Sequence, residues 1–525
     1  MRARNELILA DLIAARAETH PDLDVLTFEH LSLDRGATPD EVRTFADLHR
    51  NAHRMAAALV ARGVKPGDRF ALMMRNHPEF VEAMIAASIT GAVFVPIDPR
   101  TRGEKLRFML ADSGCVGIVG AEYCVPEVEA VRARVPDLRW MLVRETTLRD
   151  VLTREVATMD VRVDDANAPL QIMYTSGTTG DPKGIVGANY RFCAAGMLGM
   201  LFGYRPDDRP YTGLSLTHGN AQAVTLAPAL TMGLRAVFSP RFTKSRLWDV
   251  CRKHGCTTFS LVGGMATAIY SEPPRADDAD NPVRLVVSGG MPPAIWRAFE
   301  QRFAVEILEF YGAMDGGGMA YKPIGEGPVG SFGKPMPGIE MKILDEAGNE
   351  CAPGVVGEIC VRPASGGEAT VEYHGNPEAS RKKIRGGWNR SGDMGHRDAE
   401  DWLFFDYRAG GGIRHNGDFI DPSFVEKAIA ELPEIADVFV YGVPAASGAP
   451  GEKDVVAAIV LAPDARLDPA AIFAGCRRSL EANFVPSYLQ IVDEIPKTAS
   501  EKPQERFLVE RFDPHAPNVC RPPSG

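Results

Sequence analysis

The most constraining feature of this sequence is a loop rich in glycine and hydroxyl groups that directly follows an apolar segment. The loop covers residues 175–184 (TSGTTGDPKG), and the apolar segment covers residues 170–174 (LQIMY). Glycines allow a tight turn whose N–H groups point inward, the hydroxyls add uncharged donors, and Lys183 adds a positive charge. Such a loop at the end of a buried strand predicts a phosphate-binding site at the edge of an α/β sheet.

Two other interpretations of this loop have to be weighed. A Walker A loop (G-x-x-x-x-G-K-S/T) would need Gly at position 182 and Ser or Thr at position 184, so Pro182 and Gly184 exclude it. A surface turn rich in Ser, Thr and Gly has the same composition, and the loop by itself does not decide against it. The other motifs of the chain favour the phosphate site.

The bulk composition is typical of a globular protein and restricts the partners. The 525 residues correspond to roughly three or four domain-sized units, and 45% hydrophobic with 24% charged residues gives no indication of disorder. The formal net charge of −11 argues against nucleic acid or acidic membranes as partners, because both select basic surfaces. An anionic ligand must therefore be bound by a local group of donors.

Cysteine spacing and hydropathy bear on the compartment. The nine cysteines are scattered singly, without C-x-x-C metal spacing or the pattern of a disulfide framework, so we expect reduced and mostly buried thiols. Glu6 and Asp11 interrupt the apolar residues near the start, and no later run reaches about 18 apolar residues. We therefore predict no signal peptide, no membrane span and a cytoplasmic protein.

Hydrophobic periodicity predicts alternating strands and helices up to residue 310. A helix over 44–62 has Thr44 and Asp47 as a capping pair and Gly63 as its stop. Short Gly or Pro joints between the elements are typical of a parallel sheet covered on both faces. The further strands are predicted at 70–74, 93–97, 236–239, 258–262, 283–288 and 305–310, and the further helices at 78–90 and 244–254.

Composition changes in the last 200 residues or so, which indicates separate units. Residues 325–407 are dense in Gly and Pro, with strand patterns at 340–344 and 357–361, and predict a small β-rich subdomain. The glycines at 410–412 mark a flexible joint. Beyond the joint, helices are predicted at 422–432 and 469–483 and strands at 436–441 and 455–461.

These patterns predict an α/β fold with two domains. The large N-terminal domain (1–407) has layered α/β sheets and contains the β-rich subdomain. The small C-terminal domain (408–525) is α+β and mobile.

The loop at 175–184 resembles the signature of the adenylate-forming superfamily, which includes acyl-CoA synthetases and other AMP-dependent ligases, luciferases and the adenylation domains of peptide synthetases. Further matches occur in the family order over nearly the whole chain. The run at 483–489 (NFVPSYL) gives a narrower resemblance to carnitine/crotonobetaine-type acid–CoA ligases. The resemblance implies an ATP-dependent, AMP-forming ligase that joins a small-molecule carboxylic acid to coenzyme A, with ATP, Mg²⁺ and coenzyme A as cofactors and a homodimer as one form of assembly.

Such a reaction passes through an acyl adenylate, because oxide is too poor a leaving group for direct acylation of a thiol. It needs a grip on the triphosphate, a metal, a fixed nucleoside and a cation where two anions meet. The resemblance assigns the grip to Lys183 with Thr175, Ser176, Gly177, Thr178, Thr179 and Gly180. It assigns the nucleoside to Ser288, Gly289, Gly290, Phe310, Tyr311 and Gly312, and the ribose to Asp393 and Arg408. Ordinary core packing is the competing interpretation of Tyr311, which the resemblance stacks on the base.

The resemblance also implies the catalytic residues. Lys502, in the run 496–502 (PKTASEK), would bridge the substrate carboxylate and the α-phosphate, although a solvated surface lysine is the usual state of this residue type. Asp315 would be the metal ligand. Because Lys502 lies in the predicted C-terminal domain, we expect that domain to close for adenylation and then to rearrange for thiolation, where Gly417 would admit the pantetheine arm.

The acid pocket implied by the resemblance is rich in glycine. His218 would gate the pocket or merely fill it, and the glycines at 316–318 suggest a bulky or ring-bearing acid. The pocket residues are His218, Gly219, Val262, Gly263, Met265, Met314, Gly316 and Gly317.

The sequence departs from the family pattern at four positions. Met314 stands where the family has a threonine, Asp315 where it has a glutamate, Gly411 where it prefers Asp or Lys, and Glu501 where it has a glycine. A slower enzyme, a shifted geometry and lost catalysis are all consistent with these changes. Two alternatives therefore stay open: an adenylating enzyme that loads a carrier-protein pantetheine, and a catalytically weak nucleotide-binding homologue.

Overall fold

A computed structural model of the chain shows two compact units. The first comprises Met1–Thr243, Val250–Ser260 and Val371–Lys382, and the second comprises Lys244–Asp249, Leu261–Thr370 and Lys383–Gly525. The residues described by the structure are 3–30, 39–174, 182–316, 318–409, 413–415, 418–420, 422–446, 452–480, 482–498 and 501–523.

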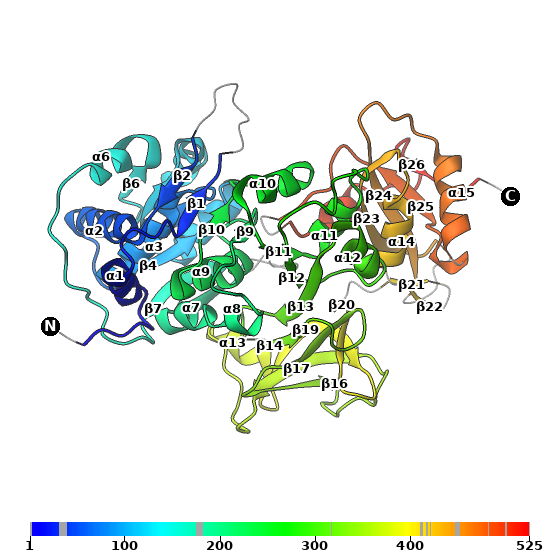
Figure 1. The fold of residues 1–525 in the computed structure, drawn as a ribbon. Coiled ribbons are helices and arrows are strands. Elements are labelled where there is room, and N and C mark those ends of the chain that lie inside the picture. Colours follow the sequence, from blue (N-terminus) through cyan, green and yellow to red (C-terminus); the bar gives the residue numbers. More distant parts are fainter. Residues whose placement is uncertain are drawn as a thin grey trace. The chain divides into compact units, whose positions relative to one another are not determined.

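A six-stranded sheet in the first unit is parallel except at one edge (Figure 1). Its order is β6-β5-β3-β4-β7-β8, and only the β7–β8 pair is antiparallel. Tyr174 at the end of β7 pairs with Gly184 at the start of β8, so these strands hold the two ends of the predicted phosphate loop. The strands are β3 (Arg69–Met73), β4 (Val93–Pro96), β5 (Cys115–Gly120), β6 (Trp140–Val143), β7 (Pro169–Tyr174) and β8 (Gly184–Ala188).

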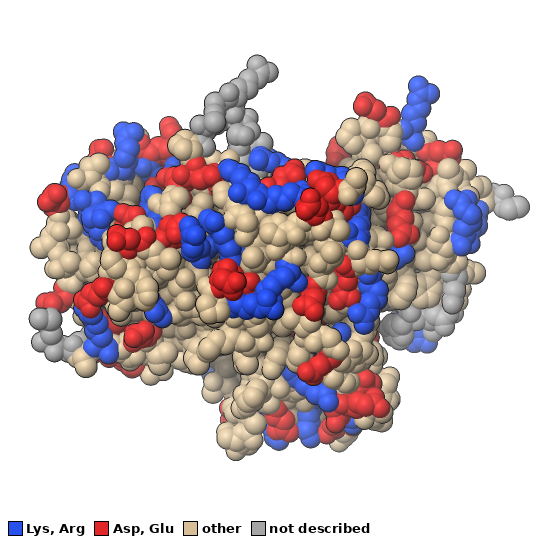
Figure 2. Space-filling view, viewed as in Figure 1, with Lys and Arg blue, Asp and Glu red and all other residues tan. Residues whose placement is uncertain are grey.

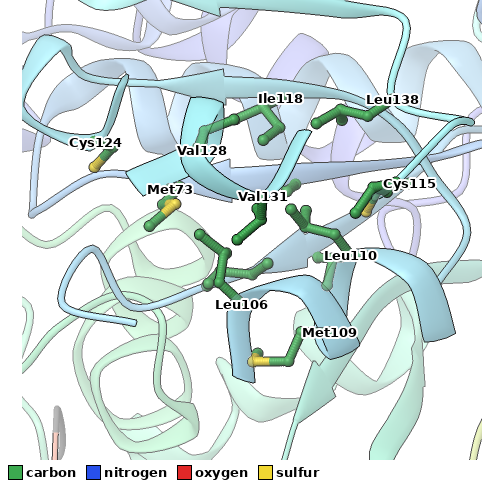
Figure 3. Packing of buried hydrophobic residues seen from close by; sticks show 14 of the residues in the cluster. Met73, Leu106, Met109, Leu110, Cys115, Ile118, Cys124, Val128, Val131 and Leu138 are labelled. Atoms are coloured by element: carbon green, nitrogen blue, oxygen red, sulfur yellow. The ribbon is translucent and has the colours of Figure 1, made fainter. Parts of the chain in front are cut away.

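Apolar side chains from this sheet and from helices α4 (Gly103–Asp112) and α5 (Val125–Arg132) form one core. Figure 3 shows Leu106 and Leu110 of α4, Val128 and Val131 of α5, and Ile118 of β5 in one cluster. Helix α3 (Pro78–Thr90) is buried along its whole length, as a helix between buried layers must be. The core explains why these short strands carry near-continuous apolar runs.

Helix α2 (Phe45–Ala61) confirms the predicted capping pair. Thr44 accepts a hydrogen bond from the Asp47 N–H at 3.1 Å, and the Asp47 carboxylate accepts one from the Thr44 N–H at 3.1 Å. Other helices of this unit are α1 (Leu9–Thr19), α6 (Arg149–Leu152), α7 (Asn189–Ala195), α8 (Leu198–Leu201), α9 (Ala227–Met232) and α13 (Pro377–Lys383), whose last residue, Lys383, is assigned to the second unit.

A second group of strands in the first unit is mostly parallel. Strand β10 pairs in parallel with β1 and β9, β9 pairs in parallel with β11, and β2 closes the edge in the antiparallel sense. The strands are β1 (Leu26–Phe28), β2 (Glu41–Arg43), β9 (Pro210–Thr212), β10 (Ala236–Phe238) and β11 (Thr258–Val262), and α10 (Leu247–His254) precedes β11.

The second unit begins with a parallel strand pair and continues into an antiparallel sheet. Strands β12 and β13 are parallel, and the order then runs β13-β14-β15-β20-β19-β17-β16 with antiparallel pairs. This confirms the strands predicted within 325–407. The elements are α11 (Gly263–Tyr270), β12 (Leu285–Gly289), α12 (Trp296–Phe303), β13 (Glu306–Gly312), β14 (Met319–Lys322), β15 (Ser331–Pro335), β16 (Ile339–Leu344), β17 (Gly357–Pro363), β18 (Ile384–Arg385), β19 (Trp388–Arg397) and β20 (Leu403–Arg408).

The last part of the second unit is a four-stranded sheet with two helices against one face (Figure 1). One face packs on α14 and α15, and the other packs on α16. The elements are β21 (Ile413–His415), β22 (Asp418–Ile420), α14 (Pro422–Ala430), β23 (Ile435–Pro444), β24 (Lys453–Leu461), α15 (Pro469–Ser479), β25 (Tyr488–Ile491), α16 (Glu505–Glu510) and β26 (Val519–Cys520). The chain therefore has the predicted large α/β part and smaller α+β part.

The predicted elements differ from the observed ones mainly at their ends. The helix predicted to reach residue 483 ends at Ser479, because Leu480 is extended, and a 3₁₀ turn follows at Ala482–Phe484. All nine cysteines are free thiols and eight of them are buried, as predicted. Every helix within the described ranges is too short or too polar to cross a membrane.

Candidate active site

Lys183 lies in the first unit, one residue before β8. Its Nζ lies 5.3 Å from the centroid of the Tyr373 ring. Tyr373 in turn pairs with Ile185 of β8. Gly184 is buried, and a Cβ there would lie 2.7 Å from Ile172 Cγ2, so glycine lets β8 approach β7 at this end. The other residues assigned to the phosphate grip, 175–180, lie outside the described residues.

The segment assigned to the adenine base is fixed by a buried carboxylate. Glu309 of β13 accepts hydrogen bonds from the N–H groups of Gly290 and Met291, the latter at 3.0 Å. Burial raises the pKa of Glu309 to about 7, although those N–H donors and the Lys322 amine oppose the rise. Gly290 has φ of 108°, a conformation that favours glycine. The turn after β12 is therefore held to the end of β13, beside Phe310, Tyr311 and Gly312.

Tyr311, Asp393 and Arg408 form one hydrogen-bonded group in the second unit. The Tyr311 hydroxyl donates to Asp393 Oδ2 at 2.7 Å, and Arg408 Nε donates to Asp393 Oδ1 at 2.8 Å. The Asp393 residue is only 4% exposed, and its strand β19 pairs it directly with Arg408 of β20. Each carboxylate oxygen still has a lone pair for a further donor such as a sugar hydroxyl.

Charge and burial act differently on the members of this group. Burial raises the pKa of Tyr311, and the charge of Asp393 adds to the rise. Burial alone would lower the pKa of Arg408, but its hydrogen bond and charge interaction with Asp393 raise it overall. The Tyr311 ring also stacks on Phe332, with 4.7 Å between centroids. Tyr311 thus both packs against an aromatic ring of the core and makes a polar contact with Asp393.

Lys502 lies in a tight hairpin of the same unit. Lys497 pairs with Pro503, and the Lys502 N–H donates to Thr498 Oγ1 at 3.1 Å. The residue is exposed, but the protein around its amine reduces hydration and lowers the pKa of Lys502. The charge of Arg408 adds to this effect and that of Asp393 opposes it. The structure therefore brings Lys502 within electrostatic range of the Asp393 group.

Gly264 lets the Lys502 hairpin pack closely on the start of α11. A Cβ at Gly264 would lie 3.2 Å from the Glu501 carbonyl oxygen and 3.3 Å from Pro503 Cδ. These contacts place the hairpin beside the segment 262–265, which the sequence assigns to the acid pocket.

Asp315 is paired with a lysine that sequence reasoning did not identify. Lys383 Nζ lies 2.8 Å from Asp315 Oδ2, and both side chains are largely buried. The Asp315 carbonyl oxygen accepts a hydrogen bond from Asn389 Nδ2 at 2.8 Å. The carboxylate proposed as a metal ligand therefore already has a cationic partner.

The predicted acid-pocket residues belong to both units. His218 and Gly219 are half-buried in the first unit, whereas Val262 and Met265 are buried and Met314 is exposed in the second. Gly263 begins α11, and Gly317 lies outside the described residues, as do the joint at 410–412 and Gly417.

The glycines near residue 316 do not indicate a large acid. Gly316 and Gly318 have φ of 80° and 66°, so the backbone itself favours glycine at both positions. A Cβ at Gly316 would lie 3.0 Å from the Thr370 carbonyl oxygen, and a Cβ at Gly318 would lie 2.5 Å from Val361 Cγ1. At both positions an added Cβ would meet protein atoms.

Glu309 and Lys383 are the polar residues of the site that sequence reasoning missed. A charged residue inside the apolar run 307–310 is a visible signal for Glu309, because such a group is buried only with partners. Lys383 has no comparable signal, since its partner Asp315 is distant in the sequence.

Comparison with known proteins identifies the family. The AMP-binding enzyme family matches residues 13–367, and the AMP-binding enzyme C-terminal domain matches residues 425–502. The sulfoacetate–CoA ligase of Cupriavidus necator is 29% identical over 95% of this chain and 97% of that protein. The crotonobetaine/carnitine–CoA ligase of Escherichia coli is 26% identical over 87% of this chain and 91% of that protein.

A solved structure shares the fold. The anthranilate CoA ligase AuaEII, crystallised with anthranoyl-AMP, superposes with a TM-score of 0.83 at 22% identity, covering 97% of this chain and 98% of that one. Since the family match spans more than half of the sequence, this chain belongs to the AMP-binding enzyme family, within the adenylate-forming superfamily.

Proposed function

We propose that this chain is an ATP-dependent, AMP-forming acid–CoA ligase. The curated relatives compared above are named as CoA ligases and match nearly end to end. The observation that carries the proposal is the hydrogen-bonded group formed by Tyr311, Asp393 and Arg408. The Lys502 amine lies close enough for the charges of Arg408 and Asp393 to affect its pKa.

In the proposed first step, a carboxylate oxygen of the acid attacks the α-phosphorus of ATP and the bond to pyrophosphate breaks. Two anions must approach each other, and the Lys502 amine would supply the positive charge between them. In the second step, the thiolate sulfur of coenzyme A attacks the acyl carbon and AMP leaves. The thiol proton goes to solvent.

The same geometry supports the nucleoside roles that we propose. Asp393 would accept hydrogen bonds from the ribose hydroxyls with the lone pairs that Tyr311 and Arg408 leave unused. The turn held by Glu309 would present the backbone of 289–290 to the base, and Lys183 with the loop at 175–180 would hold the outer phosphates.

The boundary near Tyr407 is part of this proposal. Residues 1–407 would bind ATP and the acid, and residues 408–525 would carry Lys502. The C-terminal domain match over 425–502 and the separate sheet β23–β26 support this division.

Mg²⁺ does not fit Asp315 as a direct ligand in the arrangement observed. Its carboxylate is ion-paired with Lys383, and the described residues contain no group of three or more His, Cys, Asp or Glu side chains arranged for a metal. A metal in this chain would take its ligands from nucleotide phosphates and water.

The test is a screen of carboxylic acids with purified enzyme, ATP and Mg²⁺, measuring pyrophosphate and AMP. We expect acid-dependent pyrophosphate release, and AMP formation that is accelerated by free coenzyme A. Pyrophosphate release without any use of free coenzyme A would favour a carrier-protein acceptor. No release with any acid would favour a weak nucleotide-binding homologue. Met314 and Glu501, which depart from the family pattern, are the residues that motivate this alternative.

A further inference from the structure

The ion pair between Lys383 and Asp315 is a feature that the proposed reaction does not use. Lys383, the last residue of α13, donates to Asp315 Oδ2 at 2.8 Å and to the Ser391 carbonyl oxygen at 3.1 Å. The two side chains are 17% and 15% exposed. Water and salt therefore weaken the attraction between their charges less than they would at the open surface. The position of Lys383 is thus set by two partners.

Asp315 is fixed from the backbone side as well. Asn389 donates to the Asp315 carbonyl oxygen, and Asn389 and Ser391 lie two residues apart on β19. One strand therefore holds both the lysine and the aspartate segment, and it also carries Asp393 of the nucleoside site.

A second cation is influenced by the same carboxylate. The charge of Asp315 contributes to the raised pKa of Arg408. The negative charge of Asp315 is therefore shared between a contacting ammonium and a more distant guanidinium. A hard divalent ion binds carboxylate oxygens through their charge, and a cation on the same carboxylate weakens that attraction and repels the ion.

We propose that Lys383 is a built-in competitor of divalent metal at Asp315, so that Asp315 does not coordinate the metal directly while the pair is intact. The metal bound with the nucleotide is then held by phosphates and water, and Lys383 adds a fixed positive charge next to the nucleoside site. This inference rests on the proposed function, because the metal is the one that accompanies ATP.

Mn²⁺ binding to the full-length protein tests the inference without any need for turnover. The probe is Mn²⁺ with an ATP analogue whose α,β bridge is methylene, and free Mn²⁺ is measured by its EPR signal. In Lys383→Met the carboxylate is released, and we expect Mn²⁺ to bind about tenfold more tightly. Asp315→Asn alone should change Mn²⁺ affinity less than about twofold, and it should abolish the gain when combined with Lys383→Met.

Two controls separate charge from helix effects. Lys382→Met removes the neighbouring lysine, which pairs with Glu378 on the exposed surface of α13, and should leave Mn²⁺ affinity unchanged. Lys383→Arg keeps the positive charge and should retain the wild-type affinity. Thermal melting of each variant checks that it is folded.

The inference is overturned if Asp315→Asn in the wild-type background weakens Mn²⁺ tenfold or more, since Asp315 would then be a direct ligand. It is also overturned if Lys383→Met leaves the affinity unchanged or lowers it. Binding of the analogue in the presence of Mg²⁺, measured by calorimetry, separates the two proposals. If the analogue binds without the expected Mn²⁺ pattern, only the inference fails, whereas absence of binding overturns the proposed function with it.

Discussion

Glu501, the residue before Lys502, has a backbone conformation that is costly for its residue type. Its φ is 58°, in the left-handed region, where the contact between Cβ and the backbone costs about 1–2 kcal/mol of conformational free energy. Glycine avoids this cost, but its greater conformational freedom in the unfolded chain lowers the free energy of unfolding by about 0.5–1 kcal/mol.

We therefore expect Glu501→Gly to stabilise the second unit by about 0.5–1 kcal/mol. The measurement is thermal unfolding by calorimetry. Glu346→Gly, at an exposed glutamate with an ordinary φ, is the matched control and should be neutral or destabilising. Equal destabilisation by both variants would show that the left-handed conformation costs nothing at position 501.

The lowered pKa of Lys502 predicts a pH dependence. Reduced hydration and the charge of Arg408 favour the neutral amine, so Lys502 loses its proton at a lower pH than an ordinary lysine. Because the proposed role needs the charged form, pyrophosphate release should fall on the alkaline side below the usual lysine pKa of 10.5.

The comparison variant is Lys502→Arg, since arginine keeps its charge throughout this range. Its rate at neutral pH should be lower, because the guanidinium is placed differently, but its alkaline decline should move to higher pH. An identical alkaline decline in both proteins would assign that titration to another group.

Part of the site is visible in the sequence at this scale. Tyr311, Asp393 and Lys502 stand in short motifs whose order matches the family. In the structure the Tyr311 hydroxyl donates to Asp393, and the charge of Asp393 acts on the Lys502 amine. The Lys383–Asp315 pair was not predictable, because no local pattern specifies which two distant charges meet after folding.

Secondary structure was most predictable where local signals agreed. Helix α3 has the predicted bounds, since Pro78 favours its first position and Gly91, with φ of 73°, its end. Helix α11 was missed, because it begins with Gly263 and Gly264, and glycine is unfavourable in helices. Tertiary packing decides there, since Gly264 allows the close approach of the Lys502 hairpin.

The capping box of α2 gives an element-scale prediction. Thr44→Ala removes the side-chain acceptor for the Asp47 N–H and should destabilise the first unit by about 1 kcal/mol, or about 2–4 °C in its melting temperature. Thr19→Ala, at an exposed threonine near the end of α1, should change the melting temperature far less. Similar losses in both variants would mean that the cap does not contribute.

At the scale of the molecule, the chain binds anionic ligands despite a net charge of −11. Figure 2 shows Lys and Arg interspersed with Asp and Glu over the visible face. The candidate site residues include individual cations, Lys183 in the first unit and Lys383, Arg408 and Lys502 in the second, and two of these are paired with carboxylates, Lys383 with Asp315 and Arg408 with Asp393. The overall α/β architecture could be predicted from the hydrophobic periodicity and from the short Gly or Pro joints between elements. The division into compact units could not, because it depends on packing between residues that are distant in the sequence.

The most direct test of the account is acid-dependent pyrophosphate release by the wild type and by Lys502→Ala, with an acid that the screen identifies. Lys427→Ala, at a surface lysine of α14, is the matched control. The account predicts a loss of about a hundred- to a thousandfold in Lys502→Ala with nearly unchanged ATP binding, and wild-type release in the control. Undiminished pyrophosphate release by a folded Lys502→Ala enzyme would contradict it.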